Sequence, residues 1–66
     1  MNVRPKIERL GAVLLRTGLS RSKLYELRAL GDFPEPVKLS PRAVGFLEHE
    51  VDSWIADRAA LRGSAR

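Results

Sequence analysis

The chain has 66 residues, with twelve lysines and arginines against eight aspartates and glutamates, a formal net charge of +4 and no cysteine. A chain of this length forms one small domain with little room for a large catalytic cleft, and without cysteine it has neither disulfides nor thiolate metal ligands. The excess positive charge favours an acidic partner. Since no apolar run is long enough for a signal peptide or a membrane span, we expect a cytoplasmic protein without a membrane partner.

Two polar segments flank the predicted domain. Residues 1–8 include a proline and too few apolar side chains for anchoring to a core, so we predict a flexible N-terminal arm. Residues 62–66, RGSAR, predict a flexible tail for the same reason. The folded domain is therefore predicted to span residues 9–61.

The stretch TGLSRSKLYELRALG, residues 17–31, predicts the junction of two helices. A first helix from about Ala12 to Arg16, after a short extended lead-in at Leu10, is expected to end at Gly18, which can adopt a left-handed conformation. Ser20 then suits the N-cap of a second helix over residues 21–30, because its hydroxyl can accept a hydrogen bond from a backbone N–H in the first turn. Two helices joined by such a tight glycine-containing turn form a helix-turn-helix unit.

The second helix is predicted to be buried on one side only. Leu24 and Leu27 share a face with Leu30 at its edge, by the 3.6-residue repeat. The opposite face carries Ser22, Tyr25, Glu26 and Ala29.

The first turn of this helix carries charges of the wrong sign for helix stability. Arg21 and Lys23 lie where the helix dipole is positive, and each exposed cation there costs about 0.3–1 kcal/mol. A bound polyanion would offset this cost, since the free N–H groups, the dipole and both cations would act on the same phosphates. This conflict is the main sequence signal for a nucleic-acid partner.

A hairpin and a last helix complete the predicted fold. Pro34 and Pro36 exclude helix, and strands over residues 37–39 and 43–46 flank a turn at residues 40–42, giving a basic hairpin. The last helix, residues 47–61, is expected to close the core with the stripe Leu47, Val51, Trp54, Ile55 and Leu61. We therefore predict a mainly α domain with a small β-hairpin, arranged as a winged helix-turn-helix.

The candidate DNA-binding residues lie on the second helix and the hairpin. Arg21 is the expected reader of base edges, because guanidinium pairs bidentately with guanine, although a solvated or phosphate-bound arginine is the alternative. Tyr25 either donates to DNA or lies flat over the edge of the core. Charges on a hairpin can also simply face solvent. The complete candidate set is Arg21, Ser22, Lys23, Tyr25, Arg28, Lys38, Ser40 and Arg42, of which Lys23 and Arg28 are expected to bind phosphate.

No residue set supports catalysis or a cofactor. His49 is the only histidine, so the segment HEVDS lacks the second histidine of a zinc-protease motif. The acids Glu48, Glu50 and Asp52 suit the positive end of the last helix and need no metal to explain them. With no glycine-rich phosphate loop and no nucleophile motif in the sequence, we expect no enzymatic activity, no metal, no cofactor and no small-molecule ligand.

Two stretches carry a family likeness. Residues 16–27, RTGLSRSKLYEL, and residues 31–58, which begin GDFPEPVKLSPRAVGFLEHEV, resemble the AlpA family of phage and prophage regulators. That family is similar in fold to excisionases and to MerR-type winged helix-turn-helix domains. The resemblance implies a protein encoded by a phage or a bacterium.

The resemblance also implies a function. Members of the family are small DNA-binding proteins that activate transcription, often of an integrase gene, or act in excision of a prophage or island. By analogy residues 21–30 form the recognition helix, presenting Arg21, Ser22 and Tyr25, and residues 37–46 form the wing. The chain departs from the family at Phe46, where tryptophan is common, and at Leu15, where a polar residue is usual.

The leading hypothesis is a sequence-specific DNA-binding transcriptional regulator associated with the nucleoid. Because one such unit reads a short site, we expect double-stranded DNA as partner, together with further copies of the chain or another DNA-bound protein. An excisionase-like architectural factor that bends DNA is the alternative. A further alternative is a protein-interaction adaptor or antitoxin that uses Leu15 and the last helix. RNA is less favoured, because the chain lacks an exposed aromatic platform.

Overall fold

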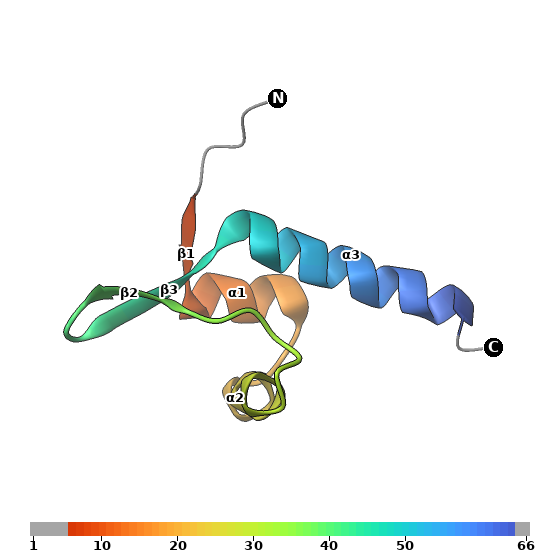
Figure 1. Ribbon diagram of the computed structural model, residues 1–66, viewed down its shortest axis with the longest axis horizontal. Coiled ribbons are helices and arrows are strands. Elements are labelled where there is room, and N and C mark those ends of the chain that lie inside the picture. The colour runs from red at the N-terminus through yellow and green to blue at the C-terminus, as the bar shows by residue number, and fades with distance from the viewer. Residues whose placement is uncertain (1–5, 65–66) are drawn as a thin grey trace.

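The computed structural model describes residues 6–64, which form three helices and a small antiparallel sheet (Figure 1). The elements in chain order are β1 (Ile7–Arg9), α1 (Leu10–Thr17), α2 (Arg21–Ala29), β2 (Val37–Ser40), β3 (Ala43–Leu47) and α3 (Glu48–Ser64). The β2–β3 hairpin projects to one side of the helices, and α3 extends to the other side. None of the helices described is both long and apolar enough to cross a membrane.

The sheet has three strands in the order β1-β3-β2, one more than the sequence predicted. β1 pairs antiparallel with β3, placing Ile7 opposite Leu47 and Glu8 opposite Phe46. The assignment of Ile7 and Glu8 to a flexible arm is therefore corrected, and Leu10 begins α1 instead of forming an extended lead-in. Pairing supplies the missing physical reason, because backbone hydrogen bonds to β3 hold a strand that has little apolar content. Residues 1–5 of the predicted arm lie outside the described part of the chain.

Gly45 lets the strands approach one another at the centre of the sheet. A Cβ at this position would collide with Ile7 Cγ2 and would lie 3.0 Å from the carbonyl oxygen of Glu8 and 3.3 Å from Leu39 Cδ1. The side chains of β1 and β2 thus cover this glycine on one sheet face. The absence of a side chain on the central strand is what allows β1 to pair with it.

The helix ends follow the predicted capping residues. Gly18 has φ +76° and its N–H donates to the carbonyl of Leu14 at 2.8 Å, which ends α1 as expected. Ser20 Oγ accepts from the backbone N–H of Lys23 at 3.1 Å, so the predicted N-cap of α2 is confirmed.

The last helix is longer than predicted. α3 continues to Ser64, so residues 62–64 are helical and their assignment to a flexible tail is corrected. Alanine, leucine and arginine are good helix formers and dominate residues 58–62, which explains the continuation. Residues 65–66 lie outside the described part.

The core gathers one or two side chains from each helix and from β3. Phe33 lies edge-on to Phe46, with the two ring centroids 5.6 Å apart. The centroid of the Phe33 ring also lies 4.9 Å from that of the Trp54 ring. Trp54 Nε1 donates to the carbonyl of Asp32 at 2.6 Å. Leu61, predicted to join this stripe, is 52% exposed because α3 has run beyond the core. The buried apolar residues are Val13, Leu24, Phe33, Phe46 and Val51.

Candidate nucleic-acid interface

The start of α2 exposes cations and contains no acid. Arg21, Ser22 and Lys23 are all exposed, and the first turn holds no aspartate or glutamate. The first turn of α3, by contrast, carries Glu48 and Glu50. Of these two helices, only α3 therefore carries acids in its first turn, where the helix dipole favours negative charge, as the sequence indicated.

The core holds α2 firmly enough to fix which face is outward. Leu24 is fully buried and its N–H donates to the carbonyl of Ser20 at 3.0 Å, while Leu19 and Leu27 are partly buried and pack against the core. Tyr25 is 43% exposed, as expected for a residue on the outer side. Leu30, expected at the edge of the buried face, is 68% exposed because the helix has already ended at Ala29.

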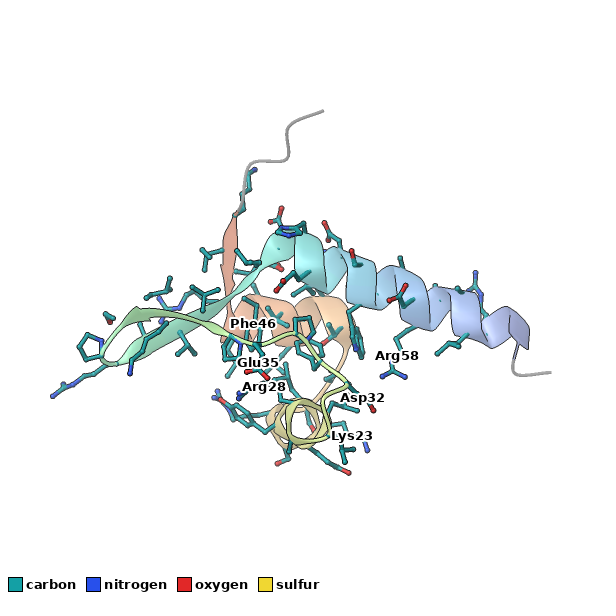
Figure 2. The ribbon with its side chains drawn as sticks, in the orientation of Figure 1. Lys23, Arg28, Asp32, Glu35, Phe46 and Arg58 are labelled. Carbon is teal, nitrogen blue, oxygen red and sulfur yellow. The ribbon has the colours of Figure 1, made fainter. Side chains whose placement is uncertain are left out.

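Two of the three cationic candidates on α2, Lys23 and Arg28, are engaged by acids. Lys23 Nζ lies 3.6 Å from Glu26 Oε1, and both side chains are more than half exposed, so this pair is weak and easily displaced. Arg28 Nη2 lies 3.3 Å from Glu35 Oε1, and Arg28 Nε is buried without a partner among the described residues. Figure 2 shows Arg28 and Glu35 beside each other, with Lys23 on a different side of α2. Arg28 is thus less available to a ligand than the sequence indicated.

The hairpin contains an irregularity that the sequence did not reveal. Lys38 pairs with Val44 and Ser40 pairs with Ala43, which leaves Leu39 as the extra residue of a β-bulge. Adjacent residues of a strand point to opposite faces, and cross-strand partners share a face. Lys38 and Ser40 therefore lie on opposite sheet faces.

This arrangement separates the roles of the three hairpin residues. Lys38 shares the sheet face of Phe46, which is the side covered by the helices, and its side chain is exposed. Ser40 Oγ accepts from the backbone N–H of Arg42 at 3.4 Å and so supports the turn. Arg42 itself is exposed at the hairpin tip. All three residues are exposed, but Lys38 and Ser40 do not share a sheet face.

Arg16 is the centre of a polar network that the sequence did not predict. Its Nη2 and Nε lie 2.7 and 3.0 Å from the two carboxylate oxygens of Glu8, and its Nη1 lies 2.5 Å from Asp52 Oδ1. The hydrogen bonds to Glu8, and then to Asp52, raise the pKa of the Arg16 guanidinium. These contacts join β1, α1 and α3.

No local pattern could have revealed this network, because the partners are 8 and 36 residues away from Arg16. Arg16 therefore acts as a structural residue of the domain and stands apart from the candidate binding residues. Among residues 6–64 there is also no group of three or more histidine, cysteine, aspartate or glutamate side chains that could hold a metal ion.

The fold and this surface define a class of protein. Three helices on a small three-stranded sheet, with a firmly anchored helix that starts in exposed cations, are compatible with a small α/β DNA-binding domain. The chain belongs to the family described as "Prophage CP4-57 regulatory protein (AlpA)", which matches residues 6–59. The resemblance found in the sequence is thereby confirmed.

Two relatives extend this result. The chain is 44% identical over 54 residues to "Uncharacterized protein ORF88" of Enterobacteria phage P4, covering 82% of this chain and 61% of the relative's own length. It is 34% identical over 62 residues to "DNA-binding transcriptional activator AlpA" of Escherichia coli (strain K12), covering 85% of this chain and 89% of that relative. The chain therefore spans about three fifths of the phage relative and most of the bacterial one.

Proposed function

We propose that this protein is a sequence-specific DNA-binding transcriptional regulator with winged helix-turn-helix architecture. In this proposal α1 and α2 form the helix-turn-helix, α2 enters the major groove, and the β2–β3 hairpin is the wing on flanking DNA. The name of the bacterial relative, a DNA-binding transcriptional activator, and the regulatory family support this function over the excisionase-like and adaptor alternatives.

One observation carries the proposal, namely the charge at the start of α2. The turn is capped by Ser20 and anchored by Leu24, so it is rigid, yet it presents Arg21 and Lys23 with no acid in the turn. Phosphate brought to this turn would meet free backbone N–H groups and two cations together. Because Arg21 and Lys23 are unfavourable for the stability of α2 itself, we expect them to bind DNA.

Each candidate residue has a separate expected role. Arg21 reads a guanine through its O6 and N7 atoms, and Ser22 and Tyr25 donate hydrogen bonds to bases or phosphates beside it. Lys23, Arg28, Lys38 and Arg42 bind phosphate and fix the register of the protein on the duplex. Ser40 acts indirectly, by holding the turn that presents Arg42.

Selection of bound sequences from random duplex DNA tests the proposal. The wild-type chain is expected to enrich one short motif, and Arg21→Ala is expected to cost about 1–3 kcal/mol on that motif and to relax its guanine position. Arg9→Ala is the matched control. Arg9 is exposed and pairs with Gly45 on the sheet face opposite Lys38, so its loss removes the same charge away from the proposed surface.

The salt dependence of DNA binding, measured together with motif enrichment, distinguishes recognition of bases from nonspecific attraction to phosphates. A chain that neutralises several phosphates loses affinity steeply with salt, with a slope of about 0.9 per phosphate. Steep salt dependence without an enriched motif would reduce the function to nonspecific binding. Equal losses for Arg21→Ala and Arg9→Ala would refute the role of the α2 start.

A further inference from the structure

A groove lies beside α3, away from the start of α2. It has a volume of about 720 Å³ and lies between residues 31–37 and the side of α3 that carries Glu50, Ser53, Trp54 and Asp57. Its apolar lining comes from Phe33, Pro34, Pro36, Val37, Leu47 and Trp54. The proposed DNA contacts use no residue of this groove.

The charge around the groove is uniformly acidic. Asp32, Glu35, Glu50 and Asp57 line it, which is half of the eight acids in the chain, and no lysine or arginine is among the lining residues. Asp32, Glu50 and Asp57 form no ion pair with the described residues. An apolar groove with unpaired acids is complementary to a segment that carries both apolar and basic side chains.

The far end of α3 is such a segment. Every residue from 56 to 62 is exposed, and Figure 1 shows that this end of α3 extends beyond the other elements. It carries Leu61, which is 52% exposed, between Arg58 and Arg62. Arg58 lies with its guanidinium 4.8 Å from the centre of the Trp54 ring, so the basic segment begins where the groove ends (Figure 2).

The groove and the basic segment occupy one face of the same helix. Residues spaced by three, four, seven and eleven positions along a helix share a face, and Glu50, Trp54, Asp57 and Leu61 follow this spacing. The first part of this face is therefore acidic and grooved, whereas the last part is apolar and flanked by arginines. Such a face is complementary to itself when a second helix runs in the opposite direction.

We propose that the protein forms a two-fold symmetric dimer in which the α3 helices of two copies pack antiparallel along this face. Leu61 of each copy enters the groove of the other beside Trp54. In an antiparallel pair of helices, the contact of Leu61 with Trp54 places the two-fold axis between residues 57 and 58. The same register brings Arg58 of one copy beside Asp57 of the other. Two-fold dimers with self-complementary patches are the commonest oligomers of soluble proteins.

Association without DNA is the first test. Sedimentation velocity up to about 1 mM protein should show a monomer–dimer equilibrium, so that even weak association is detected. Leu61→Asp should raise the dissociation constant at least about tenfold, because it removes the apolar anchor and adds a further acid to the groove. Leu15→Asp is the matched control, since Leu15 is also an exposed helical leucine, at 88%, and lies on α1.

A charge exchange and a crosslink test the geometry. Asp57→Arg should weaken the dimer, and the double variant with Arg58→Asp should restore it, because the pairing of opposite charges returns. Since the chain has no cysteine, Asp57→Cys near the two-fold axis should form a disulfide-linked dimer on mild oxidation, whereas Leu15→Cys should not.

Three results would overturn the proposal. A chain that stays monomeric at about 1 mM has no such interface. Equal effects of Leu61→Asp and Leu15→Asp would place any dimer contact elsewhere. Growth into chains longer than a dimer would show head-to-tail packing in place of a two-fold axis. None of these outcomes depends on DNA binding, so the two proposals stand or fall separately.

Discussion

Gly45 and Gly11 provide a matched pair of glycine-to-alanine substitutions with opposite expected effects. At Gly45 the new methyl group would collide with Ile7 Cγ2 and approach the Glu8 carbonyl oxygen at 3.0 Å, so β1 must move away from β3. At Gly11, in the first turn of α1, nothing lies within 4 Å of the new methyl group. The added methyl group is therefore sterically hindered at Gly45 and unhindered at Gly11.

The expected magnitudes follow from these surroundings. Forcing an extra carbon into a packed site costs about 1–3 kcal/mol, and part of that cost cannot be relieved because the Glu8 carbonyl belongs to the backbone. Gly11→Ala should stabilise by about 0.5 kcal/mol, because alanine reduces the freedom of the unfolded chain and favours helix. A domain of this size shifts its Tm by about 4–8 °C for each kcal/mol. Gly45→Ala at about 2 kcal/mol should then lower the Tm by roughly 8–16 °C.

Urea unfolding followed by circular dichroism measures both variants. The midpoint should fall for Gly45→Ala and rise slightly for Gly11→Ala, with an unchanged slope if unfolding stays two-state. Hydrogen exchange should also show faster exchange of the Glu48 amide, whose N–H donates to the Lys6 carbonyl at 2.7 Å just beyond β1. If Gly45→Ala is as stable as Gly11→Ala, the close approach of β1 to β3 is not a feature of the protein.

Three further substitutions test the capping residue, the core and the proposed phosphate contacts. Ser20→Ala should lower the free energy of unfolding by about 1 kcal/mol in urea titrations, and Ser20→Gly by only a few tenths, so equal losses would contradict the cap. Trp54→Phe should cost about 1 kcal/mol or more, because it removes the donor to the Asp32 carbonyl, and an unchanged stability would refute that bond. Glu35→Gln should release Arg28 and strengthen nonspecific duplex binding with a steeper salt slope, whereas an unchanged slope would exclude Arg28 from the phosphate contacts.

The parts of the fold that depend on local chemistry were predictable from the sequence. Gly18 and Ser20 fix the junction between α1 and α2 through backbone conformation and one side-chain hydrogen bond, and both were identified. The turn at residues 41–42 follows from proline in a short polar segment. Aromatic residues at the two ends of a hairpin favour core packing, and Phe33 and Phe46 are both buried.

The parts that depend on distant partners were not predictable. β1 is stabilised by pairing with β3, and the Arg16 network requires that Glu8 and Asp52 come together across the fold. The bulge at Leu39 arises from the pairing of β2 with β3, and the alternation of apolar and polar residues along β2 does not reveal it. The end of α3 was misplaced because helix propensity extends it past the core, where apolar periodicity no longer applies.

The sequence predicted which residue types would be exposed on α2 and the hairpin, but it did not predict the partners and orientations of all their side chains. Arg21 and Ser22 are exposed at a capped helix start, as the sequence implied. Arg28 is turned towards Glu35, a partner from the loop that the helical wheel could not include. Ser40 faces away from Lys38 because of the bulge. Contact with DNA itself stays a prediction for all of these residues.

The distribution of acids explains how a chain with a modest net charge can present a strongly basic face. Glu8 and Asp52 are occupied by Arg16, and four other acids surround the groove on α3. Glu26 is the one acid within α2 itself, and its ion pair with Lys23 is exposed and weak. The local field at the start of α2 is therefore more positive than the net charge of +4 indicates, because most of the compensating charge lies elsewhere on the molecule. The same segregation leaves the acidic groove available to the basic end of α3 from a second copy, so one charge pattern serves both proposed contacts.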